Sequence, residues 1–217
     1  MDNSGKNKLI CFDVDGTLVE TRSSWDLLTA GLGCPIERLP EIYEKTESGQ
    51  MSFTEGIRII EEMYKNSGKA TQILIKALMS DVLLKADARE TVTFIKQKGY
   101  AVYLISGGID TYVEAVARGV GADGFFSHAS LEFDVAGNFS KINYGLGQTA
   151  AKVARIKELS VKHRVPTDEI IFVGDGINDV GAFDLTRHGV AVYPYDSALE
   201  NIAWKKIKEL SELCDIV

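Results

Sequence analysis

The sequence has few cysteines, no long apolar run and no sustained block of basic residues. Its three cysteines, Cys11, Cys34 and Cys214, are far apart and lack metal-site spacing, so they indicate reduced thiols rather than a disulfide framework. The apolar runs fall short of the roughly 18 residues of a membrane helix, and the polar residues 1–8 are too few for a secretion signal. We therefore expect a cytoplasmic protein without a membrane partner.

The charge balance argues against a further class of partner. The chain has 217 residues, of which 31 are acidic and 24 basic, giving a net charge of -7 and no Lys/Arg cluster to attract nucleic acid. A content of 45% hydrophobic and 25% charged residues is typical of a globular protein. The length exceeds one typical domain and falls short of two, which suits a domain with an insertion. Nothing in the composition indicates an oligomeric state.

Two aspartates end the first apolar run of the chain. Residues 9–17 read Leu-Ile-Cys-Phe-Asp-Val-Asp-Gly-Thr, which predicts a buried strand followed by a turn. Asp13 and Asp15 are two residues apart and so share one face of an extended segment. Neighbouring carboxylates need a cation or a shared proton, and an ionised Asp beside a divalent metal can attack phosphorus. A calcium loop or an acidic turn is the alternative, but Gly16 comes fourth, whereas a calcium loop needs glycine sixth.

A long stretch separates this strand from the next predicted strand, at residues 100–106. More than eighty residues intervene, although a crossover between parallel strands needs only about a dozen. Helix start signals occur in this stretch at Ser23-Ser24, at the capping-box pair Ser52 and Glu55, and at Thr71. We therefore expect several short helices between the first two strands.

These helices predict a small cap domain inserted directly after the first strand. We assign residues 20–85 to this helical cap and residues 1–19 and 86–217 to the core domain. The alternative is that the helices simply pack onto the sheet. Their place in the sequence, beside Asp13 and Asp15, favours a cap over the two carboxylates.

Helical and strand patterns alternate over the rest of the chain. Helices are predicted at residues 88–98, 109–118 and about 149–163, strands at 124–127, 170–173 and 190–193, and a hairpin at 131–144 around Gly137-Asn138. Such alternation is typical of a parallel sheet covered on both faces. The predicted fold class is therefore α/β, with a Rossmann-like parallel sheet flanked by helices and the cap inserted after its first strand.

Three predicted strands end in segments that suit phosphate chemistry. The first ends at residues 13–17, the second at Ser106-Gly107-Gly108, and the fourth at residues 174–179, which read Gly-Asp-Gly-Ile-Asn-Asp. Ligands bind beyond the carboxyl ends of strands in such sheets, so the three segments are predicted to meet. Each one alone has a plain structural explanation as a turn or loop. The interpretation depends on their joint position.

Each segment has a role in phosphoryl transfer. Asp13 and Asp175 are predicted to hold Mg²⁺, which prefers carboxylate oxygens and water. Ser106 and the backbone N–H groups of Gly107 and Gly108 would bind phosphate oxygens. Lys152, one turn into the long helix before the fourth strand, would complete the charge balance.

Together these motifs resemble the haloacid dehalogenase-like phosphatases. Asp-Val-Asp-Gly-Thr at 13–17 is similar to the first motif of that superfamily, Ser106 to the second, Lys152 to the third, and residues 174–179 to the fourth. The Ser-Gly-Gly segment and the small cap after the first strand resemble the phosphoserine phosphatase branch. The resemblance implies a Mg²⁺-dependent phosphomonoester hydrolase of a small phosphorylated metabolite.

The resemblance also implies roles for single residues. Asp13 would be the nucleophile that becomes phosphorylated, and Asp15 the general acid and then the base. Mg²⁺ would be bound by Asp13, by the backbone carbonyl of Asp15 and by Asp175, with Asp179 supporting its water shell. The phosphoryl group would be held by Ser106, Gly107 and Lys152, and Asn178 would lie near phosphate or substrate.

The cap positions depart from the phosphoserine pattern. Phosphoserine phosphatases use a cap glutamate for the substrate's amino group and a cap arginine for its carboxylate, and ungapped counting puts Arg22 and Ile60 at these positions. Arg58 is close in sequence but on another helix face. We therefore predict that Arg22 contacts a negative or hydroxyl-rich leaving group.

Two other functions fit parts of the pattern. A phosphotransferase would pass the phosphoryl group from Asp13 to another alcohol instead of water. A signalling receiver also surrounds Mg²⁺ with strand-end carboxylates, a hydroxyl and a lysine, but receivers are about half this length and lack a helical insertion.

Overall fold

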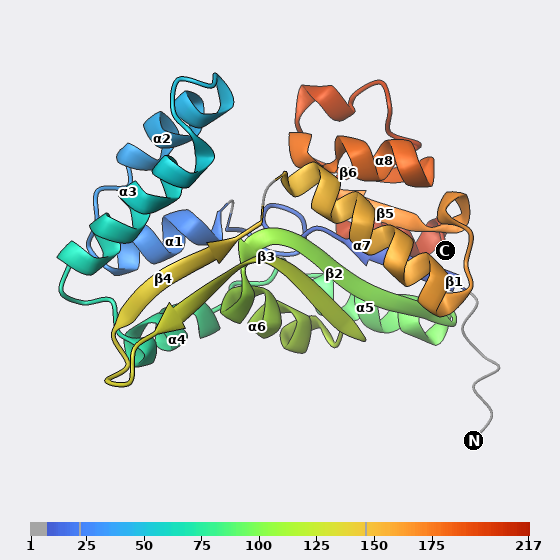
Figure 1. Ribbon diagram of the computed structural model, residues 1–217. Helices are drawn as coiled ribbons and strands as arrows, with labels where there is room; N and C mark the ends of the chain where they lie inside the picture. Colours follow the sequence, from blue (N-terminus) through green and yellow to red (C-terminus); the bar gives the residue numbers. More distant parts are fainter. Residues whose placement is uncertain (1–7, 22, 146) are drawn as a thin grey trace.

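A mostly parallel sheet forms the centre of the protein (Figure 1). The computed structural model describes residues 8–21, 23–145 and 147–217. In this part of the chain the strand order is β4-β3-β2-β1-β5-β6-β7, and only β3 and β4 are antiparallel. The strands are β1 (Lys8–Phe12), β2 (Tyr100–Ile109), β3 (Gly124–Phe133), β4 (Phe139–Tyr144), β5 (Ile171–Gly174), β6 (His188–Val192) and β7 (Lys205–Ile207). The predicted α/β fold is confirmed.

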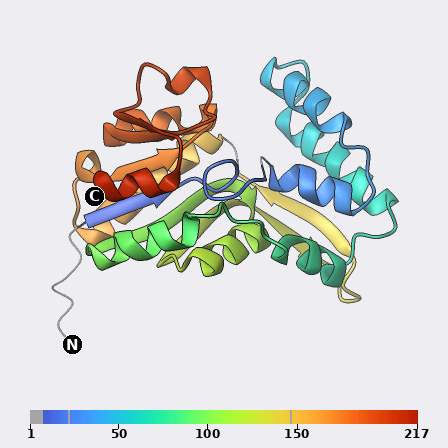
Figure 2. The ribbon, with the colours of Figure 1, turned by 180° about the vertical axis from the view of Figure 1, so that it is seen from behind.

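Helices cover both faces of this sheet (Figures 1 and 2). One face is covered by α7 (Gln148–His163) and α8 (Val180–Thr186), and the other by α5 (Ala88–Gln97) and α6 (Asp110–Val120). Successive side chains of β1 point to opposite faces, so Leu9 and Cys11 pack beneath α7 and α8 while Ile10 and Phe12 pack on the other side. All four are fully buried, as expected for the central strand of a sheet covered twice.

Four helices lie between β1 and β2 in the described chain: α1 (Ser24–Gly31), α2 (Arg38–Glu47), α3 (Phe53–Asn66) and α4 (Gln72–Ser80). The predicted helix starts are confirmed, because the side chains of Ser23, Ser52 and Thr71 each accept a hydrogen bond from a first-turn N–H. Figure 1 shows α2 and α3 at the end of the sheet away from α8. Buried residues of these helices belong to the same hydrophobic cluster as one face of the sheet. Their status as a separate domain over residues 20–85 stays a prediction.

The hairpin of β3 and β4 connects the sheet to these helices. The Ile142 N–H donates to Glu61 of α3 at 2.8 Å, and the Phe139 N–H donates to the Ala70 carbonyl at 2.8 Å. At the turn, Gly137 has a φ of +82°, which favours glycine. The hairpin thereby places Tyr144, at the end of β4, against the rings of Trp25 and Phe53.

Several predicted boundaries differ from the structure. Strand β2 continues past Ser106 to Ile109, with a register shift against β3, so Ser106-Gly107-Gly108 is not a turn after the strand. The short strand predicted at 124–127 and the first arm of the hairpin are one strand, β3. Helix α6 runs through Gly119 and ends at Val120, and its C-cap is Gly121, whose φ is +78°. Helix α2 and strand β7 were not predicted. No helix of the described residues is both long and apolar enough to cross a membrane.

Candidate active site

The three predicted segments meet at the carboxyl ends of the central strands. Strand β1 lies between β2 and β5, and the Asp13 N–H donates to the Val173 carbonyl of β5 at 2.8 Å. Asp13 follows β1, Ser106 lies in β2, and Asp175 follows β5. Parallel pairing thus brings residues more than 150 positions apart to one edge of the sheet.

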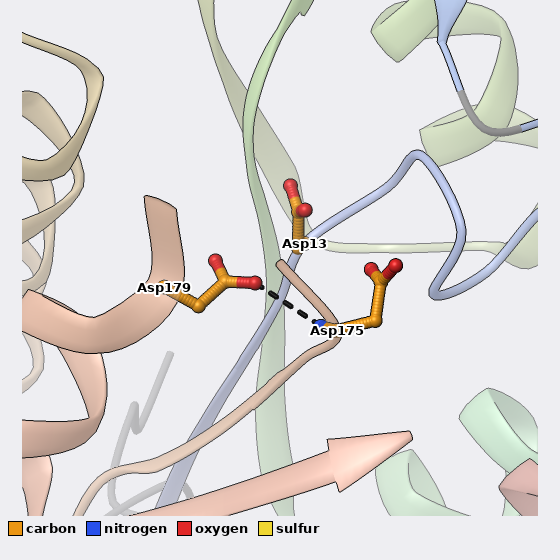
Figure 3. A group of neighbouring side chains, drawn as sticks. All are labelled: Asp13, Asp175 and Asp179. Carbon is orange, nitrogen blue, oxygen red and sulfur yellow. Dashed lines mark hydrogen bonds between the residues drawn. The ribbon is translucent and has the colours of Figure 1, made fainter. Parts of the chain in front are cut away.

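Three carboxylates converge at this edge, as Figure 3 shows. One oxygen from each of Asp13, Asp175 and Asp179 lies within 4.8 Å of the others. Asp13 is 5% exposed and Asp179 fully buried. Three hard oxygen donors at this spacing suit a divalent cation such as Mg²⁺. The side chain of Asp15 is not part of this group.

Asp179 also fixes the loop that carries Asp175. Its Oδ2 accepts hydrogen bonds from the N–H groups of Asp175 and Gly176, at 3.1 and 3.0 Å. The Thr17 hydroxyl donates to Asp175 Oδ1 at 2.7 Å and links this loop to the first motif. The position of the Asp175 carboxylate is therefore set from both strands.

Lys152 is a buried cation between two of the carboxylates. Its Nζ lies 3.0 Å from Asp13 Oδ1 and 2.5 Å from Asp179 Oδ1, and only 2% of the side chain is exposed. Burial acts to lower the pKa of Lys152, but Asp13 and Asp179 outweigh that effect, so the pKa is raised. Lys152 therefore keeps its charge and neutralises part of the acidic group.

Burial shifts the acids of the site toward the protonated form. It raises the pKa of Asp13 well above its usual value, against the opposing charge of Lys152. It raises the pKa of Asp175 to about 6, although the Thr17 hydroxyl stabilises the anion. Carboxyl groups with raised pKa values favour the protonated form until further positive charge is nearby, and a bound divalent cation would supply that charge.

Asp15 has a different environment from Asp13. Burial raises its pKa to about 6, opposed by hydrogen bonds from Ser24, whose hydroxyl lies 3.2 Å from Asp15 Oδ2. The other oxygen, Oδ1, is buried without a hydrogen-bond partner in the described chain. An acid with this pKa can hold or release a proton near neutral pH, and its unpartnered oxygen indicates where a ligand atom would bind.

Ser106 and two glycines complete the floor of the site. The Ser106 hydroxyl accepts a hydrogen bond from the Gly108 N–H at 3.0 Å. We predicted from the sequence that this N–H binds phosphate, but in the structure it is engaged within the protein. A Cβ at Gly107 would lie 2.6 Å from Gln148 Oε1. A Cβ at Gly16, whose φ is +75°, would lie 2.3 Å from Asp175 Oδ2. Glycine is required at position 16 because its φ is left-handed and the Asp175 carboxylate approaches the backbone closely, whereas a side chain at position 107 would displace the Gln148 amide.

A cleft of about 680 Å³ opens over these groups. Its floor includes Asp13, Asp15, Ser106, Gly107, Asp175 and Asn178, and its opposite wall includes Trp25, Tyr43, Phe53, Ile57, Ile60 and Tyr144. The structure thus brings the predicted catalytic, metal-binding and phosphate-binding residues together, with Lys152 just beneath the floor. Arg22 lies outside the described residues.

Sequence reasoning missed several residues of the site. Gln148, at the start of α7, accepts a hydrogen bond from Asn178 Nδ2 at 3.1 Å and donates to the Tyr144 hydroxyl. Thr17 belongs to the first motif, but the motif pattern assigns it no role. The pattern at Ser24 predicts only a helix start. The available signal for Thr17 was its hydroxyl after the first strand, because Asp175 follows the neighbouring strand β5. Nothing in the local sequence marks Gln148.

Known proteins resemble this chain over most of its length. A family model, the haloacid dehalogenase-like hydrolases, matches residues 7–184. Phosphoserine phosphatase of Lactococcus lactis subsp. lactis is 30% identical over 185 residues, covering 84% of this chain and 82% of that protein. Phosphoserine phosphatase of Archaeoglobus fulgidus is 27% identical over 187 residues, covering 86% of this chain and 52% of that protein, so the chain spans about half the length of this relative.

Solved structures have the same fold. A phosphoserine phosphatase in its apo form matches with a TM-score of 0.81 at 22% identity, covering 98% of this chain and 100% of that one. A phospho-aspartyl intermediate analogue of phosphoserine phosphatase matches with a TM-score of 0.79 at 22% identity, covering 98% and 99%. At these identities the structures show the fold alone. The family match over residues 7–184, in contrast, confirms the predicted resemblance, and the chain belongs to the haloacid dehalogenase-like hydrolases.

Proposed function

We propose that this chain is a Mg²⁺-dependent phosphomonoesterase that acts on a small phosphorylated metabolite through a phosphorylated Asp13. One observation carries the proposal. Asp13 and Asp15 line one cleft from the same strand end, and of these two carboxylates only that of Asp13 is paired with the buried Lys152. Two neighbouring carboxylates in unlike environments suit a nucleophile and a proton donor. The names of the relatives agree with a phosphatase.

The residues at hand fit the metal that this chemistry needs. Asp13 and Asp175 would hold Mg²⁺ with the Asp15 carbonyl, and Asp179 would support its water shell, since its own oxygens are occupied by Lys152 and the loop N–H groups. When bound, Mg²⁺ supplies positive charge for the phosphate oxygens and for the Asp13 carboxylate.

The first half of the reaction forms a bond between Asp13 and phosphorus. A carboxylate oxygen of Asp13 attacks, and the bond from phosphorus to the alcohol oxygen of the substrate breaks. The proton of Asp15 passes to that leaving oxygen, which a pKa of about 6 allows near neutral pH. The Ser106 hydroxyl, oriented by the Gly108 N–H, and Lys152 stabilise the phosphate oxygens meanwhile.

The second half returns the enzyme to its starting state. Asp15, now a carboxylate, takes a proton from a water molecule whose oxygen attacks phosphorus. The bond between phosphorus and Asp13 breaks and inorganic phosphate leaves. Asn178, held by Gln148, lines the cleft where it can contact phosphate or substrate. The helices over residues 20–85 serve as the cap that covers this chemistry.

The experiment is phosphate release from acetyl phosphate and from a panel of phosphorylated metabolites, with Mg²⁺ and with EDTA. Asp13→Asn should lower turnover by about a thousandfold or more, because the amide cannot act as the nucleophile. Asp184→Asn makes the same change at an exposed position of α8 and should have no effect. Wild-type rates in Asp13→Asn, with the fold intact by circular dichroism, would exclude the mechanism.

A further inference from the structure

The two sides of the active-site cleft differ in chemistry. In the part of the chain that the structure describes, all the charged residues that line it are acidic and belong to the core side, namely Asp13, Asp15, Asp175 and Asp196. The opposite wall is made by Trp25, Tyr43, Phe53, Ile57, Ile60 and Tyr144, with the hydroxyls of Ser23 and Thr46 at its edge. We call these six side chains the apolar wall. Among the described residues that line the cleft, none is Lys or Arg.

Three aromatic rings of the apolar wall are in contact. The centroid of the Tyr144 ring lies 4.8 Å from that of Phe53 and 5.9 Å from that of Trp25, both in tilted contact. The Tyr144 hydroxyl is held by Gln148 and so is tied to the floor of the cleft. Aromatic side chains arranged in this way present a large apolar area at low entropic cost to a bound group.

Arg58, a cap arginine in the described part of the chain, is engaged elsewhere. Arg58 of α3 pairs with Glu62 at 2.5 Å, its side chain is 58% exposed, and it does not line the cleft. Ile60, which counting aligns with the carboxylate-binding arginine of phosphoserine phosphatases, is 2% exposed and part of the apolar wall. Among the described residues, a leaving group with a carboxylate would therefore meet no cation on this side of the cleft and would be desolvated against apolar side chains.

We propose that the physiological substrate is a phosphomonoester whose leaving alcohol is uncharged and apolar, of the arylalkyl kind, and that the apolar wall selects it. This inference rests on the proposed function, since it names the substrate class of the same site. The phosphate lies on the acidic floor with the metal, and the remainder of the substrate packs against Phe53, Trp25 and Tyr144. Phosphoserine is disfavoured because its carboxylate meets apolar side chains.

The first test compares esters of similar alcohols. Phosphate release is measured with Mg²⁺ from 3-phenylpropyl phosphate, phosphoserine and phosphocholine, with acetyl phosphate as a small substrate that reports on the floor alone. We expect kcat/KM for 3-phenylpropyl phosphate to exceed that for phosphoserine by about tenfold or more. A preference for phosphoserine or phosphocholine, with acetyl phosphate hydrolysed, overturns this inference and leaves the phosphatase mechanism standing. Failure to hydrolyse any of the four overturns both.

The second test changes the wall itself. Phe53→Ala should raise KM for 3-phenylpropyl phosphate by about tenfold and leave acetyl phosphate turnover within about threefold. Phe125→Ala, the same change on strand β3 outside the cleft, is the matched control and should change neither. Equal losses with both substrates in a folded Phe53→Ala protein would mean that the ring only supports the site, and would contradict selection by the wall.

A further variant tests the charge argument. Ile57→Arg places a cation on the apolar wall and should shift the ratio of kcat/KM values toward phosphoserine by about tenfold. An unshifted ratio in a folded Ile57→Arg protein would overturn the proposal.

Discussion

The floor and the apolar wall of the cleft are built in opposite ways. The floor holds each charged group by at least one partner: Lys152 bridges Asp13 and Asp179, Thr17 holds Asp175, and Ser24 holds Asp15. The apolar wall consists of rings and aliphatic side chains, and its Tyr144 ring contacts those of Trp25 and Phe53. Hydrogen bonds and ion pairs therefore fix the positions of the side chains on the floor. The wall instead determines the shape and polarity of the space that the leaving group would occupy.

This difference separates the reaction from the choice of substrate. A phosphoryl group is the same in every phosphomonoester, so the residues that act on it can be shared by a whole family. The leaving alcohol varies, and side chains outside the motifs must recognise it. A change on the floor should therefore affect every substrate, whereas a change on the wall should affect some substrates and not others.

The largest expected effect of this kind comes from Lys152→Met. It removes the only cation that contacts both Asp13 and Asp179 in the described chain. We expect turnover to fall by about a hundredfold to a thousandfold for every substrate, and the free energy of unfolding to fall by about 3–5 kcal/mol because two buried carboxylates lose their partner. Phosphate release and urea denaturation measure the two effects. Less than a tenfold loss, or a loss confined to one substrate, would contradict the assigned role.

Asp15→Asn should have a smaller and substrate-dependent effect. As the proton donor, Asp15 matters most where the leaving alcohol is a strong base, so turnover of alkyl phosphates should fall by about a hundredfold or more. Phosphorylation of Asp13 by acetyl phosphate, whose leaving group needs no proton, should be affected much less, whereas hydrolysis of the phosphorylated enzyme should slow for both substrates because the base is lost. The comparison therefore measures the rate of Asp13 phosphorylation in a single turnover, with each substrate and in each protein. Equal losses in that step on both substrates would assign Asp15 to positioning rather than to proton transfer.

The raised pKa values predict a pH dependence of stability for the metal-free protein. Burial raises the pKa of Asp15 and Asp175 from 3.8 to about 6. Between these values the folded state binds more protons than the unfolded state, so stability falls as the pH rises, by about 3 kcal/mol for each carboxyl. In EDTA, Asp15→Asn should therefore be more stable than the wild type at about pH 7 and gain little at about pH 4. An equal difference at both pH values by urea denaturation would refute this.

Gln148→Ala should have the smallest effect and sharpen the boundary between floor and wall. Gln148 contacts Asn178 on one side and Tyr144 on the other, without contacting Asp13 or Lys152 through any hydrogen bond in the described structure. Losing one or two such hydrogen bonds should lower kcat/KM by about twofold to tenfold. If the loss reaches the size of that in Lys152→Met, Gln148 belongs to the catalytic floor instead.

Much of the floor could be predicted from sequence because its residues follow strands. Asp13, Ser106 and Asp175 each end or interrupt an apolar run, and parallel pairing leaves only one edge where these ends can meet. Lys152 was harder to predict, since a lysine in a helix is usually solvated, and only its position one turn into the helix before the fourth strand, together with the family motif, indicated that it belongs to the site. Only 2% of its side chain is exposed, because tertiary packing places it between the carboxylates of Asp13 and Asp179.

The wall could not be predicted in the same way. Trp25, Phe53 and Ile60 occupy apolar positions of amphipathic helices, and such positions serve a core as readily as a cleft. Helix α2 was missed because its N-cap, Glu37, makes no side-chain capping bond. Strand β7 was missed because it has three residues, two of them lysines. Nothing local marks these segments, and their positions depend on packing.

The most direct test of the central claim is to locate the phosphoryl group on the enzyme. The protein is mixed with Mg²⁺ and a phosphomonoester that it hydrolyses, and the reaction is quenched in acid within the first turnover. The protein is then digested and analysed by mass spectrometry. A phosphoryl group on Asp13, absent from Asp13→Asn and retained in a slowly turning Asp15→Asn protein, is the predicted result. Rapid phosphate release with no phosphorylated residue, or with the group on any residue other than Asp13, would contradict the mechanism.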